Sequence, residues 1–167
     1  MIQIEDVLQA DLKMLTPFSS IALCGDLILE TLPLVRASWP EVDLAQWREY
    51  VQFFSAQPEV KQAGVDGLRD STGCYCGVFA YQMDRDLLLG PVLAVRLFTA
   101  VDVTNSPRTL KALLNIVEAR ACELGCPTVQ IYLRDGQTKL ASRLRALGTM
   151  EEFSQFYKKV ESQPARI

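Results

Sequence analysis

Apolar residues recur at regular spacing along most of the chain, and the clearest pattern lies within residues 101–133. Leucine, valine and alanine recur there every three or four residues, which is the spacing of one buried face of a helix. Ser106 is a suitable N-cap and Pro107 a suitable first helical residue, while Gly125 is a typical helix stop. The alternating residues at 128–133 predict a strand. A strand, a helix and a second strand this close together favour a parallel pair of strands.

The first third of the chain has mostly helical periodicity. Residues 1–4 predict a strand, and residues 5–15 predict a helix. Residues 19–37 are apolar with a helical period, and Pro33 should kink or split that helix. Asp43 should cap the next helix, with Gln46 as its capping-box partner. The expected core stripe of that helix comprises Leu44, Trp47, Val51 and Phe54.

Beyond residue 63 the pattern changes to strands. Residues 65–69 and 75–81 predict two strands joined by a hairpin at residues 71–73. A polar connection at 83–86 then leads to a long apolar strand at 91–101, whose composition suits burial on both faces.

The end of the chain completes the expected fold. A helix is predicted at 137–147, ending at Gly148, and a last strand is predicted at 153–160. The elements together predict an α+β fold with a mixed central sheet flanked by helices. We expect about six or seven strands, with strands 91–101 and 128–133 central and parallel.

Length and charge narrow the functional classes. The 167 residues suffice for a single domain, with a helical front at 1–60 and the sheet at 63–160. The net charge of −3 argues against a general nucleic-acid binder. The N-terminal residues lack the basic start of a secretory signal, and the most apolar run, 87–95, is too short to cross a membrane. We therefore expect a cytoplasmic protein that binds neither nucleic acid nor membrane.

The cysteines predict neither a disulfide nor a metal site. They are Cys24, Cys74, Cys76, Cys122 and Cys126. An odd number without framework spacing suggests reduced thiols. The chain contains no histidine, so zinc would need an all-thiolate site, and these spacings are not those of the usual zinc knuckles. Small buried apolar side chains are the favoured interpretation.

The sequence suggests a binding site at the start of the helix that follows strand 91–101. A helix N-terminus suits an anion such as phosphate, because its amides point outward and its dipole is positive there. Arg108 and Lys111 could add charge to such a site, although cations at a helix start are more often simply solvated. Asp102 can be interpreted either as a general base or as a turn residue at the end of the strand.

Two stretches resemble the GCN5-related N-acetyltransferase (GNAT) family. LLNIVEARACELGCPTVQIYL, residues 113–133, resembles the helix and strand that follow the family's acyl-CoA pyrophosphate loop. LRALGTMEEFSQFYKKV, residues 144–160, resembles the family's late helix, its leucine–glycine stop and its closing strand. The resemblance covers residues 63–159 and implies a GNAT-like, acyl-CoA N-acyltransferase fold.

The resemblance also implies a cofactor and a site. In this family an acyl-CoA lies between two diverging parallel strands, and an amine attacks its thioester. The implied cofactor is acetyl-CoA or another acyl-CoA, and Asp102 becomes the candidate catalytic base. Gln137 matches an asparagine that precedes the family's late helix. The implied cofactor-binding residues are Val101, Val103, Thr104, Asn105, Ser106, Arg108, Lys111 and Gln137.

Three departures from the family keep two functions open. The loop has no glycine, and Pro107 lacks an amide proton for phosphate. The family's proton-donating tyrosine corresponds to Leu144, which cannot donate a proton. The strand on which the family often has a glutamate base has none here, and Arg96 is its only charged residue before Asp102. One function is an N-acyltransferase with an atypical cofactor loop, acting on a small-molecule or protein amine. The alternative is a catalytically inactive GNAT-fold module for binding or assembly, partnered by another protein or a second copy of the chain.

Overall fold

The computed structural model describes residues 18–56, 62–101, 107–149 and 158. The chain divides into two units, Met1–Gln137 and Thr138–Ile167. The predicted strand at 1–4, helix at 5–15 and strand at 153–160 all lie outside the described residues.

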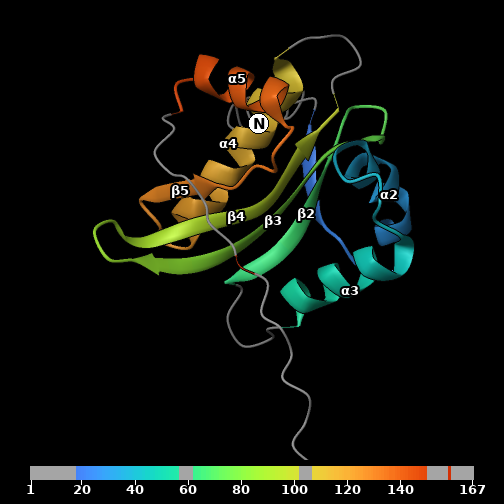
Figure 1. Cartoon of the computed structure of the whole chain (residues 1–167), viewed down its shortest axis with the longest axis horizontal. Helices are drawn as coiled ribbons and strands as arrows, with labels where there is room; N and C mark the ends of the chain where they lie inside the picture. Colours follow the sequence, from blue (N-terminus) through green and yellow to red (C-terminus); the bar gives the residue numbers. More distant parts are fainter. Residues whose placement is uncertain (1–17, 57–61, 102–106, 150–157, 159–167) are drawn as a thin grey trace, which may run out of the picture. The chain divides into compact units, whose positions relative to one another are not determined.

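The described residues of the larger unit form one mixed sheet of five strands (Figure 1). The strands follow one another in both sequence and space. They are β1 (Ser19–Ala22), β2 (Ala63–Arg69), β3 (Tyr75–Asp86), β4 (Gly90–Ala100) and β5 (Thr128–Ile131). The first three pairings are antiparallel, and β4 pairs with β5 in parallel. The predicted parallel pairing is therefore confirmed. Among the described strands β5 is the last in the sheet, so its predicted central place stays a prediction.

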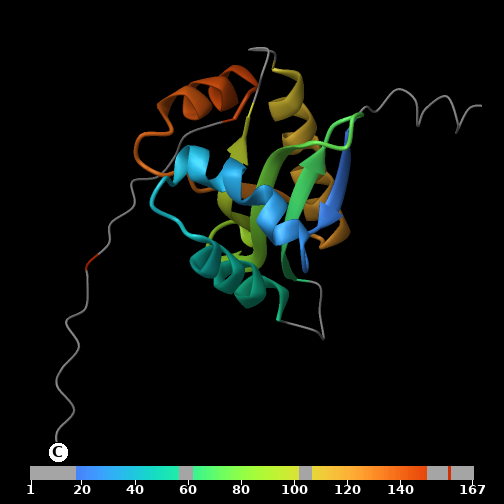
Figure 2. The same ribbon diagram turned by 90° about the vertical axis from the view of Figure 1, so that its right-hand side faces the viewer.

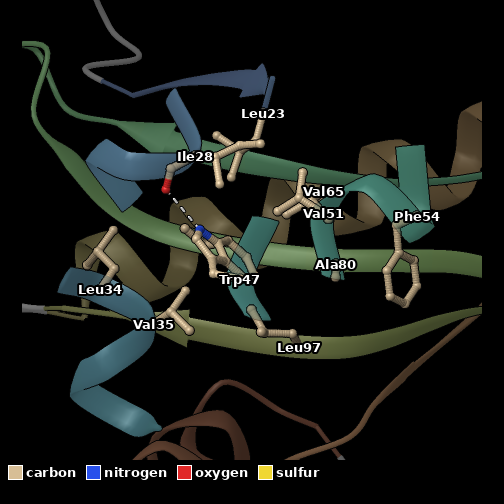
Figure 3. Close-up of a cluster of buried hydrophobic side chains, with 11 residues drawn as sticks. Leu23, Ile28, Leu34, Val35, Trp47, Val51, Phe54, Val65, Ala80 and Leu97 are labelled. Atoms are coloured by element: carbon tan, nitrogen blue, oxygen red, sulfur yellow. Dashed lines mark hydrogen bonds between the residues drawn. The ribbon is translucent and has the colours of Figure 1, made fainter. Parts of the chain in front are cut away.

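Two helices cover one face of this sheet, and a third covers the other face (Figures 1 and 2). The first face carries α2 (Leu27–Ser38) and α3 (Leu44–Ser55). Trp47 lies at the centre of their core, and its Nε1 donates to the Ile28 carbonyl at 3.0 Å (Figure 3). The core cluster contains Leu23, Ile28, Leu34, Val35, Trp47, Val51, Phe54, Val65, Val78, Ala80 and Leu97.

The predicted cap of α3 is present as a complete capping box. Asp43 Oδ1 accepts from the Gln46 amide at 2.8 Å, and Gln46 Oε1 accepts from the Asp43 amide at 3.0 Å. Trp47, Val51 and Phe54 are buried as predicted, whereas Leu44 is only half-buried.

The opposite face carries α4 (Arg108–Glu123), whose predicted apolar stripe is buried. The buried residues are Leu110, Leu113, Leu114, Val117 and Ala121. Gly125 ends the helix at φ +69°, and the following Cys126 amide donates back to Ala121 at 2.8 Å. At the other end, Pro107 occupies the N-cap position and not the first helical position that the sequence predicted. Ser106, the predicted cap, lies outside the described residues.

Residues 19–37 correct the prediction of a single helix. Ser19–Ala22 is strand β1, because it pairs along β2, and the Leu23 amide extends this pairing to the Val65 carbonyl at 2.9 Å. Pro33 lies inside α2 without splitting it. The missing proline N–H would have met the Leu29 carbonyl, and Leu29 is 54 % exposed, so water can satisfy that carbonyl.

Residues 83–86 correct a second prediction. They continue β3 and do not form a connection, because they pair with the first residues of β4 out to Asp86 and Gly90. The predicted hairpin at 71–73 is confirmed between β2 and β3. In the smaller unit, α5 (Thr138–Ala146) is followed by Gly148 at φ +90°, as predicted. Among the described residues, every helix is too short or too polar to span a membrane.

Candidate functional site

Strands β4 and β5 separate partway along β4. Their pairing runs from Val92 opposite Thr128 to Val95 opposite Ile131, and it ends where the Tyr132 amide donates to the Val95 carbonyl at 3.0 Å. β4 continues to Ala100, well past the end of β5 (Figure 1). Within the described part of the chain, no strand pairs with this edge of β4 beyond Val95. The divergence therefore leaves a strand edge whose main-chain groups can meet a ligand.

A β-bulge at Arg96 determines which main-chain groups this edge offers. The pairing of β3 with β4 steps from Ala80 opposite Leu97 to Tyr81 opposite Val95, so Arg96 is the extra residue. Beyond the bulge, the Val101 amide donates to Cys76 on β3 at 2.9 Å. Because successive residues of a strand alternate in direction, the main-chain groups of Phe98 and Ala100 face the divergence. Without the bulge, those groups would face β3.

Gln137 spans the divergence. Its Nε2 donates to the Phe98 carbonyl at 3.2 Å and to Ser38 Oγ, at the end of α2, at 3.3 Å. Its Oε1 accepts from the Arg134 amide at 2.8 Å, which fixes the orientation of the carboxamide. The Nε2 of Gln137 therefore donates two hydrogen bonds, and its Oε1 accepts one.

The loop after β5 is tied to the loop between α2 and α3. Arg134 binds both carboxylate oxygens of Glu41 at 3.2 Å, and its Nη1 also reaches the Ser38 carbonyl at 3.4 Å. Ser38 Oγ lies 3.0 Å from Thr99 Oγ1 on β4. The hydrogen bond from Arg134 keeps the pKa of the Glu41 carboxyl below its ordinary value. Glu41 therefore stays ionised at neutral pH and is a poor general base.

The bulge residue itself places a cation at the divergence. Arg96 lies over the Tyr132 ring, 4.4 Å from its centroid, and its Nη2 contacts Asp84 at 3.3 Å. Its charge also reaches Tyr50 on α3. Burial raises the pKa of Tyr50 to about 12, and Arg96 opposes that rise. The phenol of Tyr50 is therefore neutral at physiological pH.

The start of α4 has the features of an anion site. Arg108 and Lys111 are exposed there, and the first turn carries no acidic residue. Among the described residues, the first hydrogen bond of the helix runs from the Lys111 amide to the Pro107 carbonyl at 2.9 Å. The amides of Thr109 and Leu110 precede that bond and belong to the positive end of the helix.

The predicted site residues are distributed unevenly. Gln137 lies at the divergence, and Arg108 and Lys111 lie at the start of α4. Val101 follows β4, but its amide turns toward β3. The remaining predicted residues, Asp102, Val103, Thr104, Asn105 and Ser106, lie outside the described residues.

Sequence reasoning missed four residues of the divergence: Ser38, Glu41, Phe98 and Arg134. Phe98 could have been found only from the bulge, which has no signature in the apolar run of β4. Ser38 and Glu41 are distant in sequence, and nothing in the local pattern marks them.

A separate cavity of about 560 Å³ lies between α2 and the turn that joins β2 to β3. Its lining includes Glu30, Pro33, Cys74, Tyr75 and Val101. Most of these side chains present apolar surface, with one carboxylate. Phe98 and Gln137 are not among the lining residues, so the cavity is distinct from the divergence.

Comparison with known proteins gives similarity in structure alone. No protein-family model matches the sequence, and no curated protein matches it. An aminoglycoside N-acetyltransferase, AAC(6')-Iy in complex with CoA, is 16% identical, with a TM-score of 0.69 over 85% of this chain and 94% of that chain. A ribosomal-protein-alanine N-acetyltransferase from Brucella melitensis biovar Abortus 2308 is 12% identical, with a TM-score of 0.64 over 86% of this chain and 99% of that chain. A GNAT family acetyltransferase from Staphylococcus aureus is 9% identical, with a TM-score of 0.66 over 87% of this chain and 100% of that chain.

Proposed function

We propose, from the premise that this chain has the GNAT fold, that it binds an acyl-CoA and transfers the acyl group to an amine. The acceptor is a small molecule or a protein that carries an amine. The neighbours that act on aminoglycosides and on a ribosomal protein support this class of reaction, although fold alone does not determine function. A cytoplasmic location, expected from the sequence, is part of the same proposal.

The observation that carries the proposal is the strand edge at the β4–β5 divergence. The pantetheine arm of CoA contains two amides, which pair with a strand edge as another strand would. The bulge at Arg96 turns the main-chain groups of Phe98 and Ala100 toward that opening. The residues present therefore fit the arm of the cofactor.

The phosphates of the cofactor belong at the start of α4 in this proposal. Arg108 and Lys111 supply positive charge, and the amides of the first turn supply hydrogen-bond donors. Pro107 supplies no donor, so we expect weaker binding than a glycine-rich loop would give.

The chemistry requires little covalent assistance from the protein. Bound acyl-CoA supplies an activated thioester carbonyl. The acceptor nitrogen forms a C–N bond there, the C–S bond breaks, and the thiolate leaves. Asp102 is the proposed base for the proton of the amine, since the Arg134 contact leaves Glu41 a poor one. Leu144 cannot protonate the thiolate, so solvent has that role.

Titration with acetyl-CoA tests the proposal directly. We expect calorimetry to detect binding, the melting temperature to rise with acetyl-CoA concentration, and acyl transfer to follow with amines. Dephospho-CoA is a suitable control, because it keeps the pantetheine arm and loses one phosphate. If acetyl-CoA at millimolar concentration neither binds nor yields an acylated amine, the enzyme assignment is wrong.

A catalytically inactive binding module is the second candidate. The observation that favours it is the Gln137–Phe98 hydrogen bond, which occupies a main-chain group that the cofactor would use. In that case the partner is a protein or a second copy of the chain. A folded chain that neither binds acetyl-CoA nor acylates an amine would support this candidate.

A further inference from the structure

We infer that Gln137 closes the unpaired edge of β4 at the β4–β5 divergence to the cofactor, and that Arg134 and Glu41 are positioning residues which hold Gln137 there. The inference rests on the proposed function, because it concerns the same acyl-CoA site. Gln137 thereby has a role different from the direct cofactor contact that the sequence suggested: its carboxamide takes the place of a cofactor amide on β4.

The hydrogen bonds of Gln137 support this role. A side chain that awaits a ligand would leave a donor or acceptor unused. Both Gln137 donors are instead engaged, with Phe98 and Ser38, and its oxygen accepts from Arg134. The amide of an incoming cofactor would donate to the same Phe98 carbonyl. The carbonyl oxygen has two lone pairs, but the Gln137 carboxamide lies 3.2 Å from it on the side from which the cofactor amide would approach. The Gln137–Phe98 bond must therefore lengthen or break to make room for the cofactor.

The attachment of Arg134 explains what keeps the carboxamide in place. The main-chain amide of Gln137 donates to the Arg134 carbonyl at 3.1 Å and closes the turn that contains Gln137. The Arg134 side chain then binds Glu41 through two hydrogen bonds and Ser38 through a third. Bidentate pairs of this kind fix orientation as well as contributing energy. Glu41 therefore acts on the edge of β4 through Arg134 and Gln137.

The inference predicts a direction that a purely structural role would not give. Removing a residue that only supports the fold lowers stability and leaves cofactor affinity unchanged or weaker. Removing a competitor for the Phe98 carbonyl makes affinity stronger, even where the protein without ligand becomes less stable. The change should be about two- to tenfold in Kd, since one neutral hydrogen bond is exchanged.

The test compares CoA binding by calorimetry in the full-length wild-type chain, Gln137→Ala and Glu41→Gln. Gln52→Ala, an exposed glutamine on α3, is the matched control. We expect Gln137→Ala to bind CoA about two- to tenfold more tightly, Glu41→Gln to change in the same direction by less, and Gln52→Ala to match the wild type. Melting temperatures without ligand report any loss of folding separately.

The outcomes separate this inference from the proposed function. Binding by both proteins, tighter for Gln137→Ala than for the wild type, would support both. Binding by Gln137→Ala but not by the wild type would support the closing role and contradict the proposed function. Binding by the wild type with equal or weaker binding by a folded Gln137→Ala would overturn the closing role and leave the proposed function intact. Binding by neither folded protein would overturn both. In a binding wild type, the Gln137 side-chain amide protons should also exchange faster with solvent once CoA is added; unchanged exchange would contradict the inference.

Discussion

Asp66 on β2 and Arg120 on α4 form an ion pair in the interior of the larger unit, with Nη2 2.9 Å from Oδ2. The Asp66 side chain is only 3 % exposed, and Arg120 also lies over the Tyr81 ring, 5.4 Å from its centroid. Burial raises the pKa of the Asp66 carboxyl, and the Arg120 guanidinium opposes that rise. The pair joins α4 to the sheet, and α4 also presents the proposed phosphate site.

Arg120→Leu should lower the free energy of unfolding by about 3 kcal/mol at pH 7, because it leaves Asp66 buried without its partner. The loss should be smaller at pH 4. The pKa of the Asp66 carboxyl is higher in the native state than in the unfolded chain, so the native state takes up its proton first as pH falls. The penalty for the buried, unpaired charge is therefore absent at low pH and develops as pH rises from the unfolded pKa through the native one. Urea unfolding at the two pH values measures the difference. Arg48→Leu on the exposed side of α3 is the control, and an equal loss at both pH values would contradict the explanation.

Tyr50 should make stability sensitive to alkali. Its pKa is about 12 in the native state because of burial, against about 10 in an unfolded chain. Between these values the unfolded chain loses a proton that the native chain keeps, so stability falls as pH rises from 10 to 12. The contribution is about 2 kcal/mol. Tyr50→Phe should therefore lose less stability than the wild type over this range, while the pH dependence of the two proteins is the same near pH 8. Parallel curves up to pH 12 would show that the phenol is not buried.

The capping box at the start of α3 should contribute measurably to stability. Asp43→Ala removes an acceptor 2.8 Å from the Gln46 amide and should cost about 1 kcal/mol. Glu49→Ala, a change at an exposed position in the same helix, is the control and should have little effect. Chemical denaturation of the three proteins measures the difference. Equal stability of Asp43→Ala and the control would mean that water replaces the cap without loss.

Arg108 should govern affinity for the phosphates of CoA. Arg108→Glu reverses a charge at the start of α4 and should weaken binding at least tenfold, or about 1.4 kcal/mol. Arg48→Glu makes the same change in charge on α3 and is the matched control. The effect of Arg108→Glu should shrink as salt concentration rises. Equal affinities for the two variants would place the phosphates elsewhere.

The sequence by itself determined the elements whose signals are local. Asp43 and Gln46 predicted the start of α3, because a capping box involves only neighbouring residues. The spacing of leucines predicted the buried face of α4, and Gly125 predicted its end. The short strand–helix–strand unit predicted the parallel pairing of β4 with β5, because a connection of that length has few other solutions.

The tertiary structure decided what depends on residues distant in sequence. Ser19–Ala22 is a strand only because β2 is available to pair with it, and local helical periodicity cannot report that partner. The bulge at Arg96 depends on the register between β3 and β4, which an apolar run leaves undetermined. The contact of Gln137 with Phe98 follows from that bulge and from the end of α2, because a hydrogen bond across the divergence exists only once both sides have been placed.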